Sequence, residues 1–296
     1  MTTEQQKDHI DTLAASALVL FNALLGLNQA LVKMVNVAFS PVFQSGLRSA
    51  CAFVVVYLWA RLARKRLSVT DGSLPYGLFV GFLFGLEFAL LFIAVEHTSV
   101  ARASLLFYSM PFITALGAHF LFPAERLTPL KIIGLVLALV GISLVLFDTS
   151  TQPGPSAWLG DALALCAAFA WAGIALFTRA TRLVNSSPEQ VMLYHLGVSA
   201  VLLIPLALAI GGPVREPTAE LLGIFAFQVI AVASVGFLVW AWVLRIYPVS
   251  NMASFSLLAP VFGVFFGWLI FDDPLSWRFA VALAAVGIGL VLINRR

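Results

Sequence analysis

Charged residues are scarce in this chain, and cysteine is nearly absent. Asp, Glu, Lys and Arg make up 10% of the 296 residues, whereas soluble domains carry about a quarter. The two cysteines, Cys51 and Cys166, both lie inside apolar runs. We interpret them as free thiols that pack as small apolar side chains. A soluble globular domain is therefore not expected, because its surface would need many more charges.

Several catalytic signatures are also missing. The chain has no G-x-x-x-x-G-K-[ST] loop, so ATP is not expected to drive any process within it. It has neither H-E-x-x-H nor G-x-S-x-G, the signatures of zinc proteases and serine hydrolases. His119 has no second ligand at a suitable spacing, so no metal site is predicted. We therefore predict no enzyme activity, no cofactor and no metal. The net charge of +3 is explained by loop residues and does not call for a nucleic-acid partner.

Long apolar blocks dominate what is present. Hydrophobic residues make up 61% of the chain, and they gather in blocks of about twenty residues, enough for a helix to cross the hydrocarbon core. Each block should be a helix, because lipid cannot hydrogen-bond an open backbone. The sequence predicts an all-α polytopic membrane protein, joined by short loops, with ten spans at 13–34, 41–63, 74–96, 101–122, 128–148, 157–180, 188–211, 218–246, 249–271 and 275–294. Residues 1–12 are polar and precede a full-length span, so no cleavable signal is expected.

One pattern occurs twice along the chain. Ala103-Ser104 recurs as Ala253-Ser254, and Pro111 recurs as Pro260. Prolines open matching spans in both halves, at Ser40-Pro41 and Ser187-Pro188, Leu74-Pro75 and Glu216-Pro217, and Thr128-Pro129 and Asp273-Pro274. Proline suits a first helical turn because its missing N–H costs nothing there. The sequence thus predicts two five-helix repeats, 13–148 and 157–294, linked by 152–155.

The Lys and Arg residues of the loops predict the orientation. With a cytoplasmic N-terminus, twelve of the 17 basic residues fall inside and five outside. Both termini are then cytoplasmic. Five spans is an odd number, so the second repeat is inverted relative to the first. Inverted repeats are the usual construction of a secondary transporter, with its site near the midplane between them.

With its paired repeats, its late prolines at 111 and 260 and its glycine-dotted fifth and tenth spans, the chain resembles the drug/metabolite transporter superfamily. Within it, the chain is similar to EamA-type ten-helix exporters and to the YddG-like group of bacterial amino-acid exporters. The resemblance covers nearly the whole chain and rests on architecture. It implies a central cavity surrounded by spans 1, 3, 4, 6, 8 and 9, with spans 5 and 10 as a peripheral scaffold. It also implies export of amino acids, including aromatic ones, and related metabolites across the inner membrane.

Span 1 carries a polar stripe on one helical face. Asn22, Gly26, Gln29 and Lys33 follow each other at steps of four, three and four residues. Asn22 and Gln29 fit either a cavity wall or hydrogen bonding between helices. Lys33 lies near the outer end, where snorkelling to the interface is expected. In span 6, Trp171 stands at the position equivalent to Gly26, so its ring is expected between the halves.

Glu87 is the acidic residue well inside a span. Burying a carboxylate in the membrane is costly, so such residues are often functional. Glu87 lies about 200° around the helix from Gly85, the last glycine of a packing ridge that begins at Gly77. With Phe84, it is expected to face the cavity and to bind a substrate ammonium or a coupling proton; a protonated carboxyl bonded within the bundle is the alternative. For Arg48, local pairing or snorkelling is the favoured interpretation over attraction of a carboxylate.

Spans 4, 8 and 9 supply the remaining candidates. A proline within a helix usually kinks it, so Pro111 and Pro260 are predicted kinks, which either serve alternating access or set packing. The other expected cavity residues are Ser104, Tyr108, Gln228, Trp240 and Ser254.

We therefore predict a secondary transporter that works as a monomer by alternating access. Its partners are the lipid bilayer and small solutes, amino acids above all. Within transporters, the alternative is broad-specificity drug and metabolite efflux. An integral-membrane enzyme is a weaker alternative because it would need a cluster of His, Asp or Glu at one membrane face. A channel is weakened by the lack of a repeated polar or charged ring.

Overall fold

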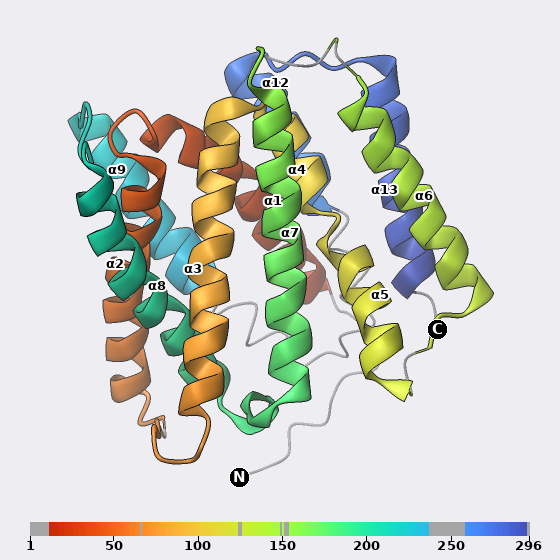
Figure 1. Ribbon diagram of the computed structural model, residues 1–296. Helices are drawn as coiled ribbons and strands as arrows, with labels where there is room; N and C mark the ends of the chain where they lie inside the picture. The colour runs from red at the N-terminus through yellow and green to blue at the C-terminus, as the bar shows by residue number, and fades with distance from the viewer. Residues whose placement is uncertain are drawn as a thin grey trace.

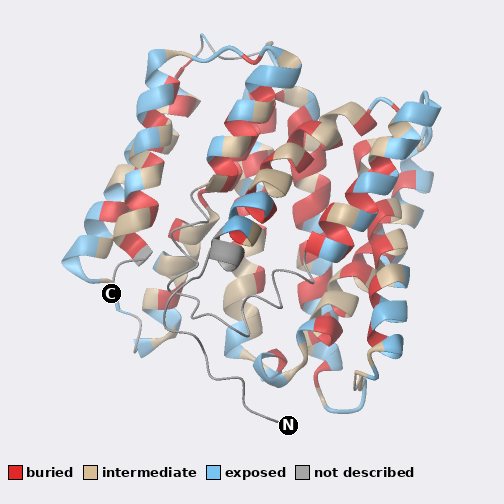
Figure 2. Cartoon of the chain, turned by 180° about the vertical axis from the view of Figure 1, so that it is seen from behind, coloured by how far each residue is buried: buried red, intermediate tan, exposed pale blue. Residues whose placement is uncertain are grey.

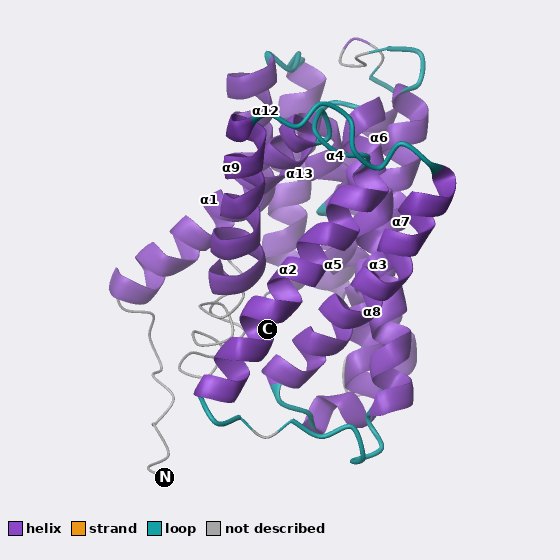
Figure 3. Cartoon of the chain, turned by 90° about the vertical axis from the view of Figure 1, so that its left-hand side faces the viewer, coloured by secondary structure: helices purple, strands orange, loops and turns teal. Residues whose placement is uncertain are grey.

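The computed structural model describes residues 12–65, 67–123, 126–148, 150, 154–236 and 258–294. This part of the chain is almost wholly helical, with short connecting loops (Figures 1 and 3). Its helices are α1 (Thr12–Val35), α2 (Pro41–Leu62), α3 (Leu74–His97), α4 (Val100–Phe107), α5 (Met110–Leu121), α6 (Pro129–Leu146), α7 (Ala157–Ala180), the short 3₁₀ helix η3 (Arg182–Asn185), α8 (Pro188–Ile210), α9 (Ala219–Phe227), the π-helix η4 (Gln228–Gly236), α12 (Leu258–Phe271) and α13 (Trp277–Asn294).

The described helices confirm an all-α polytopic fold. Eight segments are long and apolar enough to cross a membrane, and α12 and α13 are shorter apolar helices. Two expected spans differ in detail. Span 4 is divided into α4 and α5, and span 8 continues from α9 into a π-helix. The end of span 8 and the start of span 9, residues 237–257, lie outside the described residues.

Prolines begin several helices as the sequence predicts. Pro41, Pro129 and Pro188 each stand in the first turn of α2, α6 and α8. Asp273-Pro274 was expected to open the last span in the same way, and this expectation is wrong. Helix α13 begins at Trp277, and Ser276 Oγ accepts a hydrogen bond from Phe279 N at 3.1 Å. The Asp273 carboxylate instead accepts a hydrogen bond from Ala101 N at 2.9 Å, so it caps α4.

Equivalent helices of the two repeats pack against each other and run in opposite directions. Helix α2 packs on α8, with Gly46 near its start against Ile204, and Phe53 further along against Gly197. Helix α6 packs on α13 in the same antiparallel sense, with Gly134 against Gly289 and Gly141 against Ala282. Repeats related by an axis in the membrane plane require this arrangement.

Helices α6 and α13 form a pair at one side of the bundle (Figure 1). Exposed residues line the outward faces of the helices, whereas buried residues line the faces turned toward each other (Figure 2). Several of the exposed side chains are large and apolar, including Val201 at 73% and Leu139 at 63% exposure. Such a surface suits contact with lipid, because a water-soluble surface of this kind would aggregate.

The interior is built where helices of both halves meet. Helix α3 packs on α7 and α8, and α12 packs on α1 and α4. The crossing of α1 and α12 depends on small residues, because a Cβ on Gly26 would lie 2.5 Å from Cβ of Phe262. We call the end of the bundle with the loops after α1, α3, α6, α8 and α12 the Asp148 end, and the opposite end the Arg64 end.

Candidate functional site: the buried interior of the bundle

Helix α3 supplies the centre of the candidate site. Its glycine ridge packs against α8, where Gly77 lies against Tyr194 and Gly81 against Val198. This contact confirms the close packing expected of the ridge and turns Glu87 away from α8. Glu87 is 1% exposed, and neither of its carboxylate oxygens accepts a hydrogen bond from any described residue. A buried carboxylate without partners is costly and therefore calls for an explanation.

Arg48 enters this interior from α2. Its side chain does not snorkel, because only 4% of the residue is exposed. The guanidinium carbon lies 4.2 Å from the ring centroid of Phe88 and 4.7 Å from that of Phe92. One guanidinium nitrogen donates a long hydrogen bond of 3.5 Å to Asn28 Oδ1 on α1. Arg48 sits about 10 Å along α2 from Pro41, and the aromatic faces of α3 hold its guanidinium within the bundle.

The break between α4 and α5 places Tyr108 in the buried interior. Helix α4 ends at Phe107, and Pro111 stands in the first turn of α5, so the predicted kink at Pro111 is a full interruption at Tyr108 and Ser109. Tyr108 is 5% exposed, and its ring lies edge-on to that of Phe107, with centroids 5.7 Å apart. Broken helices are tolerated at membrane depth where protein or a cavity surrounds them.

The second repeat contributes aromatic and amide groups to the same interior. His195 of α8 stacks on Phe84, with ring centroids 4.8 Å apart and an angle of 11°. Gln228, the first residue of the π-helix, is fully buried and accepts a hydrogen bond of 3.3 Å from Gln44 Nε2. A π-helix is rare and often marks a functional position. The interior is therefore a joint product of both halves.

Three other predicted cavity residues have more local surroundings. Asn22 donates a hydrogen bond of 2.7 Å to Leu18 O on its own helix. Ser104 is fully buried against α12, where a Cβ on Gly263 would lie 2.4 Å from its Oγ. Gln29 is buried, and its Oε1 accepts no hydrogen bond from the described residues.

Some of the remaining candidates lie among the described residues and others do not. Trp171 is half-buried and lies edge-on to Phe107 at 6.3 Å. Pro260 is the third residue of α12, and the residues that precede this helix are not described. The kink predicted there, like the predicted cavity residues Trp240 and Ser254, lies outside the described residues.

At the Asp148 end, a pocket of about 470 Å³ opens between α1, α3, α9 and α12. Lys33 and Arg215 line it together with Glu96. Lys33 Nζ donates to Thr98 O at 3.4 Å and lies 4.9 Å from the ring centroid of Phe271. Arg215 forms an ion pair with Glu96 and donates to Asn36 O at 2.9 Å. The pocket mouth is thus lined by cations that already have partners.

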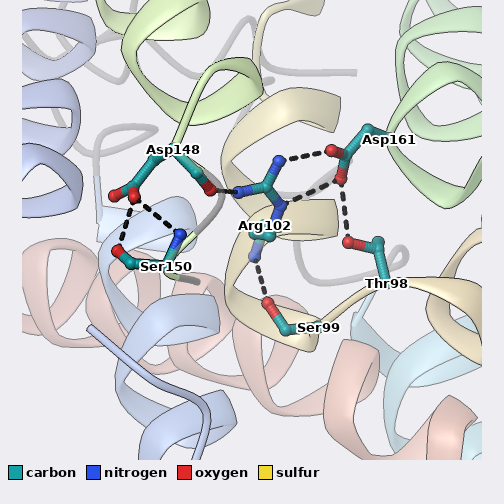
Figure 4. Close-up of polar contacts among 6 residues, drawn as sticks. All are labelled: Thr98, Ser99, Arg102, Asp148, Ser150 and Asp161. Carbon is teal, nitrogen blue, oxygen red and sulfur yellow. Dashed lines mark hydrogen bonds and ion pairs between the residues drawn. The ribbon is translucent and has the colours of Figure 1, made fainter. Parts of the chain in front are cut away.

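A second buried arginine joins the two repeats at the same end. Arg102 of α4 is ion-paired with Asp161 of α7, and its guanidinium also donates to Asp148 O at 2.9 Å (Figure 4). Thr98 Oγ1 donates to Asp161 Oδ1 at 2.8 Å. We call Thr98, Arg102, Asp148 and Asp161 the Arg102 cluster. Arg102 is 0% exposed within α4, so it is an interior group and not a charge of the membrane surface.

Two carboxyl groups at the Asp148 end, those of Asp148 and Asp273, have shifted pKa values. Burial raises the pKa of the Asp273 carboxyl, although the hydrogen bond from Ala101 N and the charge of Lys33 oppose that rise. Burial also acts to raise the pKa of Asp148, but hydrogen bonds from Ser150 and Ser276 outweigh it, and the pKa is lowered. Asp273 thus holds its proton more readily than a free carboxyl does, and Asp148 less readily.

Sequence reasoning did not select Asn28, Gln44 or Arg48 as site residues. Asn28 lies about 100° from Gln29, off the polar stripe of span 1. Gln44 and Arg48 do stand four residues apart on one face of span 2, which is the signal that could have found them. The pairing of Arg102 with Asp161 had a weaker signal, as both residues stand within five residues of the starts of spans that begin at the same membrane face.

Comparison with known proteins agrees with this architecture. The chain is 30% identical over 262 residues to the probable amino-acid metabolite efflux pump of Escherichia coli (strain K12), with 85% of this chain and 84% of that protein covered. It is 25% identical over 254 residues to the uncharacterized transporter YoaV of Bacillus subtilis (strain 168), covering 85% and 86%. A solved structure described as a crystal structure of protein has a TM-score of 0.66, 22% identity and coverage of 94% and 96%, which supports the fold.

The sequence profile of the EamA-like transporter family matches the chain twice, at residues 12–147 and 158–295. These matches confirm the resemblance to the drug/metabolite transporter superfamily and identify a multi-pass membrane transporter, whereas the YddG-like grouping stays a prediction. The chain therefore belongs to the EamA-like transporter family.

Proposed function

We propose that this protein exports amino acids, including aromatic ones, and related small metabolites across the bacterial inner membrane. One observation carries the proposal: opposite charges and amide groups are buried beside aromatic rings where the repeats meet. Arg48 and Glu87 are 4% and 1% exposed. A purely structural interior would be apolar, or its polar groups would be fully bonded.

The chemistry of this interior suits a small amphipathic solute. Phe84, Phe88 and Phe92 supply an apolar wall, with edge-to-face ring pairs at 4.5 and 5.6 Å. Arg48 and Glu87 supply one charge of each sign at its edge. The relative from Escherichia coli is named as a probable amino-acid metabolite efflux pump, which supports the same solute class.

We infer an alternating-access mechanism in which a monomer suffices. At the Asp148 end the repeats are joined by contacts that include the Arg102–Asp161 ion pair. Release of a solute at this end is expected to separate the repeats there and to break such contacts. Under the positive-inside rule the Asp148 end is periplasmic, and both termini are cytoplasmic. Since the interior forms between the two halves of one chain, no second copy is needed.

Transport in proteoliposomes tests the proposed function. Vesicles loaded with unlabelled phenylalanine should accumulate labelled phenylalanine by counterflow, and other amino acids should compete. Protein-free vesicles are the control. If no amino acid moves or competes while cationic dyes do, the amino-acid function is wrong and broad drug efflux takes its place.

Cysteine accessibility tests alternating access. With Cys51 and Cys166 replaced by alanine, Gln29→Cys should react with a membrane-impermeant thiol reagent from either face, and substrate should change both rates. Val201→Cys is the matched control, because this residue is 73% exposed on the outward face of α8 and should be shielded by lipid. Reaction of Gln29→Cys from one face only, unchanged by substrate, would contradict the mechanism.

A further inference from the structure

Arg48 and Glu87 form an incomplete pair of charges. The guanidinium of Arg48 covers the ring of Phe88, the residue that follows Glu87 in the chain, yet the described structure contains no direct ion pair between Arg48 and Glu87. Arg48 makes one hydrogen bond of 3.5 Å, to Asn28, and Glu87 accepts none from described residues. Desolvated charges of opposite sign are normally held in direct contact, because their attraction must offset lost hydration. Here both retain unused hydrogen-bonding capacity.

The aromatic wall brings Arg48 to the part of α3 that carries Glu87. Phe84, Phe88 and Phe92 follow at intervals of four residues on α3, so their rings lie on one helical face. The guanidinium of Arg48 covers the last two rings. Glu87 precedes Phe88 in the chain and therefore lies at the edge of the same wall.

We propose that Arg48 binds the α-carboxylate, and Glu87 the α-ammonium, of a zwitterionic amino acid whose side chain lies along the phenylalanine wall. A guanidinium binds a carboxylate by donating two parallel N–H···O hydrogen bonds to it. The unpartnered carboxylate of Glu87 accepts hydrogen bonds from an ammonium. A zwitterion thus supplies the two missing partners at once and leaves no net charge in the interior. This inference rests on the proposed function and names the recognition element within it.

The arrangement predicts discrimination against half-charged analogues. An amine without a carboxylate leaves Arg48 without its anionic partner, and an acid without an amine leaves Glu87 without a donor. Sites built around buried polar groups reject analogues that leave those groups unpaired. Loss of one charge-assisted hydrogen bond is expected to weaken binding by about 10- to 100-fold.

Competition in counterflow tests the assignment with three probes: phenylalanine, phenylalaninamide as a cation without a carboxylate, and 3-phenylpropionate as an anion without an amine. The wild type should prefer phenylalanine over both by about 10-fold or more. Arg48→Gln should weaken phenylalanine by that factor and leave phenylalaninamide nearly unchanged. Glu87→Gln should weaken phenylalanine similarly and leave 3-phenylpropionate nearly unchanged. A purely structural role would not change the ranking of the probes.

Matched controls separate recognition from folding. Arg61→Gln and Glu220→Gln alter exposed residues far from the wall and should keep the wild-type ranking. If Arg48→Gln does not fold, Arg48→Lys keeps the charge but removes the paired geometry, and it should weaken both carboxylate probes relative to phenylalaninamide. If the Arg48 and Glu87 variants fold, transport phenylalanine and rank the three probes as the wild type does, the inference is wrong and the proposed function still stands. A wild type that moves no amino acid would overturn the proposed function itself.

Discussion

Two arginines are buried in this bundle near carboxylates, and they differ in how completely they are bonded. Arg102 at the Asp148 end donates from Nε to Asp161 Oδ1 at 3.2 Å, forms an ion pair through a terminal nitrogen and donates to Asp148 O. Arg48 in the interior has one hydrogen bond of 3.5 Å and two aromatic faces. Burial of charge is common to both, so burial alone does not mark a binding site.

Unused hydrogen-bonding capacity separates the two. In the Arg102–Asp161 pair, direct contact between the charges offsets their lost hydration. Thr98 donates a further hydrogen bond to the Asp161 carboxylate. Arg48 and Glu87 make no direct contact that could offset their lost hydration. Their unused hydrogen-bond donors and acceptors lie beside the phenylalanine rings of α3. The first pair is best explained as a fastening between repeats, and the second as a receptor for a solute.

The largest expected effect comes from breaking the fastening. Asp161→Asn should lower the free energy of unfolding by about 3–5 kcal/mol, because it leaves Arg102 buried without its anionic partner. Thermal unfolding in detergent measures this, with the exposed substitution Glu220→Gln as control. An Asp161→Asn variant as stable as the control would show that the ion pair does not hold the repeats together.

Removing both charges at once sharpens the comparison. Arg48→Met combined with Glu87→Leu should raise the free energy of unfolding by about 1–4 kcal/mol, because apolar packing replaces two desolvated charges. Counterflow of phenylalanine should be lost. The equivalent pair, Arg102→Met with Asp161→Leu, should instead destabilise, because Thr98 and Asp148 O lose their partners. Equal effects from the two double variants would remove the proposed distinction.

A smaller effect is expected from shifting α3 without changing any charge. A Cβ on Gly81 would lie 2.5 Å from Tyr194 O and 2.6 Å from Val198 Cβ. Gly81→Ala should therefore cost about 1–3 kcal/mol by overpacking and should weaken transport by displacing Glu87 from Arg48. Gly223→Ala is the control, because its Cβ would meet no atom within 4 Å. Full transport in Gly81→Ala would show that the site tolerates movement of α3.

The smallest expected effect concerns pH at the Asp148 end. Burial raises the pKa of Asp273 above its ordinary value of 3.8. The folded state then holds this proton to higher pH than the unfolded chain does. The residue's contribution to stability is fully present below its ordinary pKa and falls as pH rises through the raised value. Asp273→Asn, which still offers an oxygen to Ala101 N, should flatten this slope in the melting temperature. A parallel slope in both proteins would contradict the assignment.

Much of the fold could be predicted because lipid restricts the possible structures. Within the described residues, the apolar blocks and the prolines before them located the helix ends to within a few residues, except that span 4 divides into α4 and α5 and that Asp273 caps α4 rather than opening α13. Glu87 was chosen as a site residue because a carboxylate within a span is costly. Phe84 was chosen because it was expected to face the same way, and Tyr108 because it shares one face of span 4 with Ser104. The contact of Arg48 with the rings of Phe88 and Phe92 could not be predicted, because it depends on the rotation of α2 against α3.

The sequence by itself determined that this chain is a bundle of membrane helices written as two related halves, since each apolar block must satisfy its own backbone hydrogen bonds in lipid. Only the tertiary structure decided which polar groups find partners. Packing against neighbouring helices sets which way each face of a helix points. The glycines of α3, for example, pack against α8 and turn Glu87 toward the interior. For that reason, two arginines that look alike in the sequence are bonded so differently in the folded protein.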